Sequence, residues 1–341
     1  GIPANIQVLS TYIYEEIVGF GPAAFSRAAV LSVLLGCLAL IGVIFQWRLT
    51  RRAQVLNTNV ADRKPRIFLS KPIRIFTEII IWLFFIFTSF VPFISMALVS
   101  LTKAYGLQFS LENMTWEHYI FLLFEDPKAM HAIWISLKLA FFTTVFALVI
   151  GTAVAYIRFA YPTVSSKLLE MFITIPYALP GTVFALCMIF TWIEPIPGWN
   201  PGIYGTIWIL FIAYVTRFLI LQVRGSSTAF SQVDSSMEAA GQISGAGLVA
   251  RWKTILIPIL LPGIVGGALL VMLTSLTELT ISNLLWSSGT ETIGVVIFGY
   301  EQAGYTTYST ACSMLIIMGI FVIAMLFFWA NKGWNRKVLK K

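Results

Sequence analysis

The chain has 341 residues, of which 58% are hydrophobic and only 11% are charged. This composition, with a mean hydropathy of +0.84, excludes a soluble globular domain, in which about 25% of residues are charged. The net charge of +8 does not indicate a nucleic-acid partner, because the basic residues fall in short segments between apolar runs. The composition therefore predicts an all-α polytopic membrane protein.

Seven apolar runs approach the length of about 20 residues that a helix needs to cross the hydrocarbon core of a bilayer. They are expected at residues 23–47, 75–101, 132–157, 168–193, 206–221, 258–279 and 308–330. If these spans alternate in direction, nearly all basic loop residues fall on one side and most acidic ones on the other. Because Lys and Arg accumulate in cytoplasmic loops, we expect the N-terminus of this fragment outside and the C-terminus in the cytoplasm.

No metal site or cofactor is expected. The three cysteines lie within apolar runs and read as small buried hydrophobic residues. His118 and His131 share one polar stretch without a cysteine or a nearby histidine at ligand spacing.

An internal similarity suggests that the chain begins inside a repeated unit. The segment 14–16, Tyr-Glu-Glu, returns as Tyr-Glu-Gln at 300–302, and each copy precedes one span with a basic end. Read as a parallel repeat, the chain divides into the end of a preceding unit at 1–50, a basic cytoplasmic linker at 51–74, a complete six-span unit at 75–330 and a basic cytoplasmic tail at 331–341. The alternative is a chance likeness between two apolar helices.

The segment between the fifth and sixth predicted spans, residues 224–257, has a pattern of its own. Residues 235–243 suit a short helix, glycines at 245 and 247 end it, and 248–256 predict a second helix with one apolar face. Pro258 suits the start of the next span, because the first helical turn needs no proline N–H.

This segment resembles the EAA loop in the permease subunits of ATP-binding-cassette (ABC) importers. The residues that carry the resemblance are Glu238, Ala239, Ala240, Gly245, Ala246, Ile255, Ile257 and Pro258. Glu238 lies one residue further from Gly245 than the family's pattern places its glutamate, and Ala239 occupies that place. An amphipathic loop helix lying on the membrane surface is the alternative.

The resemblance implies a six-span type I ABC importer permease unit in a bacterial inner membrane. It implies two partners besides membrane lipid: a separate ABC ATPase, expected as a dimer and docked on this loop, and a periplasmic or lipid-anchored solute-binding protein. The chain itself shows no G-x-x-x-x-G-K-[ST] phosphate loop, so we expect it not to be an enzyme.

Polar residues and prolines within the spans are candidates for the translocation path. Glu278, with Ser275 and Thr277, lies near the outer end of the sixth predicted span, where ionisable residues are rare and suggest function; the alternative is a helix-end carboxylate. Pro176 and Pro180 interrupt the fourth span as a hinge or as a static kink. Arg217, near the inner end of the fifth predicted span, is expected to be an anchor at the membrane interface, and the alternative is a substrate ligand.

The substrate is predicted from resemblance alone. Residues 2–6, 12–14 and 289–293 are similar to the fused double permeases of ferric-iron importers, which implies ferric iron. Permeases for thiamine or aminoalkylphosphonate are alternatives within the family. An ion-coupled secondary transporter, an alternative of another class, would need ionisable residues at mid-membrane, and only Glu278 comes near.

Overall fold

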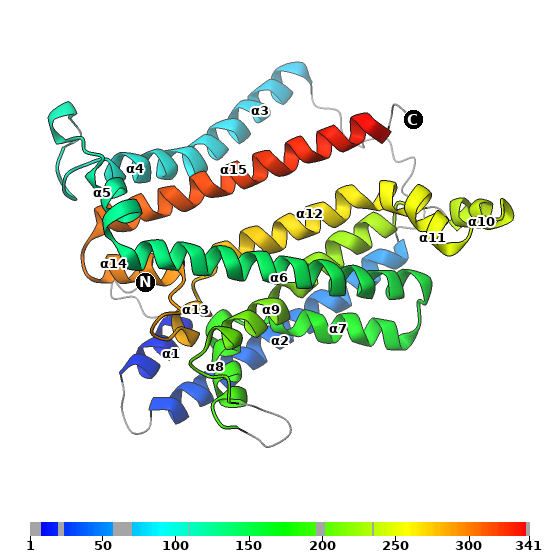
Figure 1. The fold of residues 1–341 in the computed structure, drawn as a ribbon, viewed down its shortest axis with the longest axis horizontal. Coiled ribbons are helices and arrows are strands. Elements are labelled where there is room, and N and C mark those ends of the chain that lie inside the picture. Colours follow the sequence, from blue (N-terminus) through cyan, green and yellow to red (C-terminus); the bar gives the residue numbers. More distant parts are fainter. Residues whose placement is uncertain are drawn as a thin grey trace. The chain divides into compact units, whose positions relative to one another are not determined.

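The computed structural model describes residues 8–19, 24–56, 70–108, 110–195, 202–233 and 235–338 (Figure 1). Within these ranges the regular structure is helical, with one isolated bridge between Thr102 and Met114. The predicted all-α membrane fold is confirmed. Six helical stretches are long and apolar enough to cross a membrane, and a seventh is present if one sharply bent helix pair counts as a span.

The first half of the described chain contains, in order, α1 (Leu9–Val18), α2 (Ala24–Leu56), α3 (Lys71–Phe85), the π-helical segment η2 (Ile86–Phe90), α4 (Val91–Ser100), η3 (Leu111–Asn113), α5 (Glu117–Ile120), η4 (Phe121–Glu125) and α6 (Pro127–Ala160). The second half contains α7 (Val164–Ala178), α8 (Gly181–Trp192), α9 (Ile207–Phe230), α10 (Ser235–Ile243), α11 (Leu248–Arg251), η5 (Trp252–Leu256), α12 (Ile257–Leu276), α13 (Ser282–Leu285), α14 (Ile293–Gln302) and α15 (Thr306–Val338).

The chain forms two compact units. The first comprises Gly1–Ala39, Lys128–Val296 and Ile317–Lys341, and the second comprises Leu40–Pro127 and Ile297–Ile316. In the first unit α1 and the start of α2 share a hydrophobic core with α8 and α9, through residues such as Ile13, Ala28 and Phe184. The expected division of the chain at residue 50 into two permease units stays a prediction.

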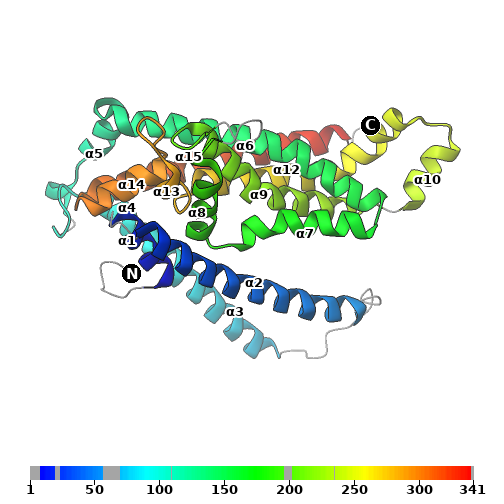
Figure 2. The ribbon, with the colours of Figure 1, turned by 90° about the horizontal axis from the view of Figure 1, so that it is seen from below.

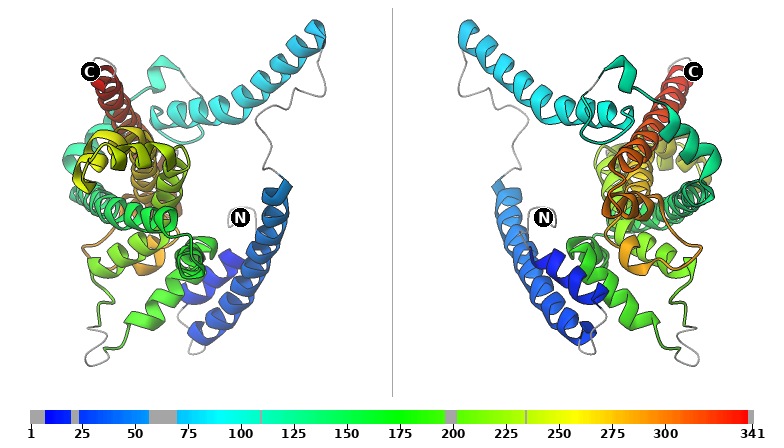
Figure 3. Two further views of the ribbon diagram at one scale, coloured as in Figure 1. Left: turned by 90° about the vertical axis from the view of Figure 1, so that its right-hand side faces the viewer. Right: turned by 90° about the vertical axis from the view of Figure 1, so that its left-hand side faces the viewer.

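The helices α9 and α12 of the first unit lie side by side, and Figure 3 looks along them. A Cβ added to Gly225 would lie 2.7 Å from the Cα of Gly267, and one added to Gly263 would lie 2.6 Å from the Cβ of Ala229. Such close backbone approach is typical of helix packing in membranes. The hydrophobic effect does not drive helices together in lipid, and small residues permit the close van der Waals contact that does.

Gln222 of α9 is fully buried at this contact. Its Nε2 donates to Ser226 Oγ at 3.0 Å, to the Ile264 carbonyl at 3.1 Å and, more weakly, to Thr152 Oγ1 at 3.3 Å. This amide therefore ties α6, α9 and α12 together, as polar side chains do between membrane helices.

Several predicted span boundaries were wrong, and two of them bear on the site. Helix α9 does not end near residue 221 but continues to Phe230, because Gly225 lets its last turns stay packed on α12. Helix α12 ends at Leu276, so Glu278 lies in the turn that follows it. Of the predicted linker, residues 51–56 and 71–74 belong to α2 and α3, and 57–69 lie outside the described residues.

A π-helical segment ends two residues before a proline in two spans. Segment η2 precedes Pro92, and η5 precedes Pro258. A proline in a continuous helix lacks one N–H and presses its ring on the carbonyl four residues earlier, and a wider turn accommodates both effects. Helix α12 begins at Ile257 with Pro258 in its first turn, as predicted, but helical turns already precede it without a break from Leu248.

Tyr300 connects separate segments of the second unit through polar and aromatic contacts. The Tyr300 hydroxyl donates to Asp126 Oδ2. The centre of the Tyr308 ring lies 5.9 Å from that of the Tyr300 ring and 4.6 Å from that of the His118 ring. The His118 Nε2 is 2.9 Å from the Thr102 carbonyl. Burial, with the Asp126 carboxylate adding to it, raises the pKa of the Tyr300 phenol above its ordinary 10.0.

We expect Tyr300→Phe to lower the free energy of unfolding by about 1.5–3 kcal/mol, because it removes a hydrogen bond to a charged acceptor. Since the pKa of the folded state is raised, this contribution is complete below the unfolded pKa near 10 and is lost as the pH rises above it. Thermal unfolding in detergent at neutral and alkaline pH measures the difference. Tyr305→Phe, at an exposed position, is the control, and equal melting temperatures for both variants would contradict the prediction.

Candidate functional site

The fourth predicted span is broken between α7 and α8, which are bent by 106° (Figure 2). Leu179 precedes Pro180, and its backbone is extended with φ −70° and ψ 143°, as the steric demand of a following proline requires. The break leaves the Leu179 carbonyl without a helical partner, and Arg217 Nη1 of α9 donates to it at 3.1 Å. The expected break is confirmed at Pro180, whereas Pro176 lies inside α7 and does not interrupt it.

The turn after α12 packs against this break. A Cβ on Gly181, the first residue of α8, would lie 2.7 Å from Thr280 Cβ. Within the turn, Glu278 Oε1 accepts the Ile281 N–H at 2.8 Å, and the Glu278 carbonyl accepts the Ser282 hydroxyl at 3.0 Å. The carboxylate thus stabilises the turn through its hydrogen bond to the Ile281 N–H. This contact fits the alternative that Glu278 is a structural carboxylate at a helix end.

A polar pocket of about 350 Å³ lies where the break, α9 and the turn meet. It is lined by Tyr177, Arg217, Phe218, Thr274, Thr277 and Glu278. Three helices that are distant in sequence therefore bring one cation, one carboxylate and several hydroxyl groups to one cavity. A concave site with a few convergent polar groups is the usual form of a small-molecule site.

The pocket contains only some of the predicted path residues. Thr277 and Glu278 line it, and the prolines flank Tyr177, whereas Ser275 is 2% exposed and does not line it. Arg217 lines the pocket and lies near the middle of α9, so its predicted place near the inner end of the span was wrong. The predicted span ended at residue 221, nine residues before the end of α9. The sequence signal that was missed is an arginine well inside a long apolar helix.

The predicted coupling segment folds as expected. Helix α10 has the predicted bounds, Ser235–Ile243, and Gly245 follows with φ +75°, a left-handed conformation that side chains with a Cβ rarely adopt. A Cβ on Gly241 would lie 3.0 Å from Ile255 Cδ1 and 3.3 Å from Arg251 Cδ. The glycine turn and the small face of α10 therefore fold the two short helices against each other.

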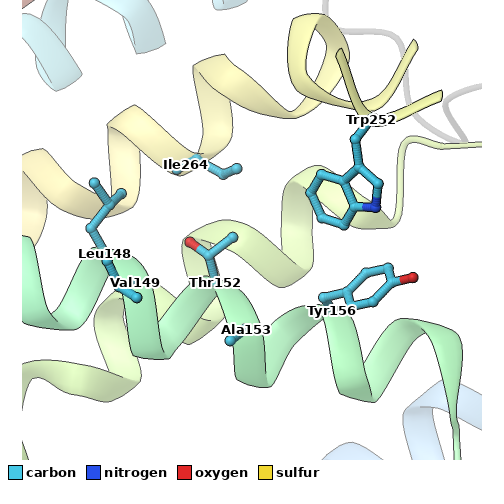
Figure 4. A pocket seen from close by; sticks show the side chains of 7 residues that line it. All are labelled: Leu148, Val149, Thr152, Ala153, Tyr156, Trp252 and Ile264. Atoms are coloured by element: carbon cyan, nitrogen blue, oxygen red, sulfur yellow. The ribbon is translucent and has the colours of Figure 1, made fainter. Parts of the chain in front are cut away.

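An aromatic cluster fixes this segment to the ends of the spans. The Trp252 ring of η5 lies 5.0 Å from that of Tyr156 on α6, and the Tyr156 ring lies 5.9 Å from that of Phe230 on α9. Leu256 is 1% exposed in the same cluster. Trp252 and Tyr156 also border an apolar groove of about 420 Å³ along α6 (Figure 4). A displacement of the segment would thus reach two spans directly, through packed rings.

The predicted coupling residues have different surroundings. Ala240, Gly245 and Ile257 are exposed, while Ala246, Ile255 and Pro258 are half-buried. The side chains of Glu238 and Ala239 lie outside the described part of the structure, although their backbone belongs to α10. Contact of Glu238 with a partner therefore stays a prediction. Sequence reasoning missed Met237 and Ile243, which are 45% and 88% exposed on α10.

No family model matches the chain, but individual proteins do. The putrescine transport system permease PotI of Escherichia coli K12 is 26% identical over 210 residues, 60% of this chain and 73% of PotI. The PhnV permease of Salmonella paratyphi A, assigned to a 2-aminoethylphosphonate transport system, is 23% identical over 62% of this chain and 78% of PhnV. The Fe(3+)-transport system permease FbpB 2 of Haemophilus influenzae is 24% identical over 42% of this chain and 27% of FbpB 2.

The fold has neighbours of the same kind. A chain of the bacterial alginate ABC transporter, solved with its alginate-bound periplasmic protein, matches with a TM-score of 0.59 and 15% identity, over 78% of this chain and 94% of that one. With the bundle, the short helix pair at its end and these relatives in view, the chain belongs to the membrane-spanning permeases of ABC importers. It is accordingly a multi-pass inner-membrane protein.

Proposed function

We propose that this permease imports a small charged solute through the pocket at the α7–α8 break, driven by a separate ATPase that docks on α10 and α11. The observation that carries the proposal is the coupling segment, a glycine-hinged helix pair fixed to α6 and α9 by Trp252 and Tyr156. The chain itself hydrolyses nothing, and its part is to change the access of the pocket.

Exposed apolar residues on α10 support the proposed docking of the ATPase. Met237 and Ile243 of α10 expose apolar surface, and exposed apolar surface marks interaction sites. Gly241 is buried against Arg251 and Ile255 on the other side. A partner bound to α10 would therefore displace η5 when it moves. The aromatic cluster of Trp252, Tyr156 and Phe230 would transmit this displacement to α6 and α9.

The orientation follows from the same proposal. If the ATPase is cytoplasmic, the α10–α11 end of the first unit faces the cytoplasm, as the distribution of Lys and Arg also predicts. A periplasmic or lipid-anchored binding protein would then deliver the solute to the opposite end. These partners are carried over from the family and from the alginate importer, which was solved with a periplasmic protein.

The proposed solute is small and charged. Ferric iron, the expectation from the sequence, is supported by FbpB 2, while PotI and PhnV carry putrescine and 2-aminoethylphosphonate in their names. All three solutes are small and charged, which suits a pocket that holds Arg217 and Glu278.

Two measurements on the full-length protein test the proposal. We expect an ATPase to co-purify from native membranes, and ATP enclosed in membrane vesicles to drive uptake of one of these solutes when a matching binding protein is present. Uptake that follows a proton or sodium gradient, with no ATPase bound, would overturn the proposal in favour of a secondary transporter.

A further inference from the structure

The pocket at the α7–α8 break contains a cationic and an anionic side chain that come from different segments. Arg217 lies in α9, ten residues after its start at Ile207 and thirteen before its end at Phe230, which places the guanidinium near the middle of a candidate span. Glu278 lies in the turn after α12. Ionisable groups at such depth are costly and are found mostly where they have a function.

Both groups keep hydrogen-bonding capacity after their contacts within the protein. A guanidinium has five N–H donors, and Arg217 uses Nη1 for the Leu179 carbonyl. Glu278 uses Oε1 for the Ile281 N–H. Among the described residues neither side chain makes a further hydrogen bond. Both line the cavity, where their opposite charges attract each other. The pocket therefore offers donors from α9 and a carboxylate oxygen from the turn.

We infer that the pocket binds a small zwitterion, with the anionic group on Arg217 and the ammonium group on Glu278. The inference rests on the proposed function and specifies its solute. A planar guanidinium recognises phosphonate or carboxylate oxygens in a bidentate manner, and the hydroxyl groups of Thr274, Thr277 and Tyr177 lie around the same cavity. A solute with both charges offers an opposite charge to each of the two side chains.

Solutes with one sign of charge fit less well. A ferric ion or a diamine would be attracted by Glu278 but repelled by the like charge of Arg217, which lines the same cavity. A simple anion would face the same penalty from Glu278. The structure thus favours an aminoalkylphosphonate or a compound of the same charge pattern over the ferric iron expected from the sequence.

The test is binding to the purified full-length chain in detergent, by calorimetry and by thermal shift. The probes are 2-aminoethylphosphonate, ethylphosphonate without the ammonium group, putrescine without the anionic group, and ferric citrate. We expect 2-aminoethylphosphonate to bind, and ethylphosphonate and putrescine to bind about 10- to 100-fold more weakly, which is the usual effect of losing one charge-assisted hydrogen bond.

Three variants connect this binding to the pocket. Glu278→Gln keeps an oxygen for the Ile281 N–H and should weaken 2-aminoethylphosphonate much more than ethylphosphonate. Arg217→Lys keeps the charge and should retain part of the affinity, whereas Arg217→Gln should lose it. Arg224→Gln is the matched control, since Arg224 is exposed on the same helix outside the pocket.

Three results would overturn the inference: no binding of 2-aminoethylphosphonate to the wild type, equal binding of putrescine or ferric citrate, or equal losses in the control variant. The ATPase co-purification experiment is independent of these outcomes. If an ATPase binds but the zwitterion does not, the proposed function stands and the solute class falls. If the zwitterion binds and no ATPase does, the site stands and the import mechanism falls.

Discussion

Replacing Gly225 with leucine is expected to lower the melting temperature of the protein in detergent by roughly 10 °C or more. A Cβ at this position would lie 2.7 Å from the Cα and 3.1 Å from the backbone N of Gly267, and 3.2 Å from the Gly263 carbonyl. These are backbone atoms of a packed helix, so no side chain can rotate away. Overpacking of a tight core typically costs about 1–3 kcal/mol, and separating α9 from α12 should exceed that range.

Gly266→Leu provides the matched control. Gly266 lies on α12 next to Gly267, but a Cβ there meets nothing within 4 Å. We therefore expect the free energy of unfolding to change by no more than about 0.5 kcal/mol. The comparison separates close packing from the general effect of losing a glycine in a helix. If the two leucine variants melt at the same temperature, the α9–α12 contact does not stabilise the protein as described.

The second large effect is expected at Gly245, where Gly245→Val should uncouple the permease from its ATPase. Gly245 has φ +75° and open space around it, so its requirement is conformational and not steric. A β-branched residue held in this region costs about 1–3 kcal/mol, which corresponds to a roughly 5- to 150-fold weaker docking if the partner must restore the turn. Co-purification of the ATPase and ATP-driven uptake measure the loss.

Two further substitutions test the reason for this loss. Gly245→Asn should retain most of the coupling, because asparagine tolerates the left-handed conformation. Gly247→Ala should be nearly silent, since Gly247 has an ordinary φ and no neighbour within 4 Å of a Cβ. Full coupling in Gly245→Val would show that the turn conformation is not needed for docking. Equal losses in all three variants would show a dependence on loop flexibility instead.

The sequence by itself determined the class of the fold and the coupling segment. Apolar runs of sufficient length predict spans because a bilayer imposes one thickness on every crossing helix. The bounds of α10 and the turn at Gly245 were also predicted correctly, because short-range rules on helix propensity and positive φ act within a few residues. The break at Leu179 follows for the same reason, as Pro180 restricts the residue before it.

The tertiary structure alone decided where α9 ends and what the pocket contains. Helix α9 extends to Phe230 because Gly225 packs on α12, a contact between segments about 40 residues apart that no local pattern encodes. The same register places Arg217 at mid-helix, where it meets the free carbonyl of Leu179 and shares a cavity with Glu278. Neither partner lies near Arg217 in the sequence, so its role emerged only when α7, α9 and the turn after α12 were brought together.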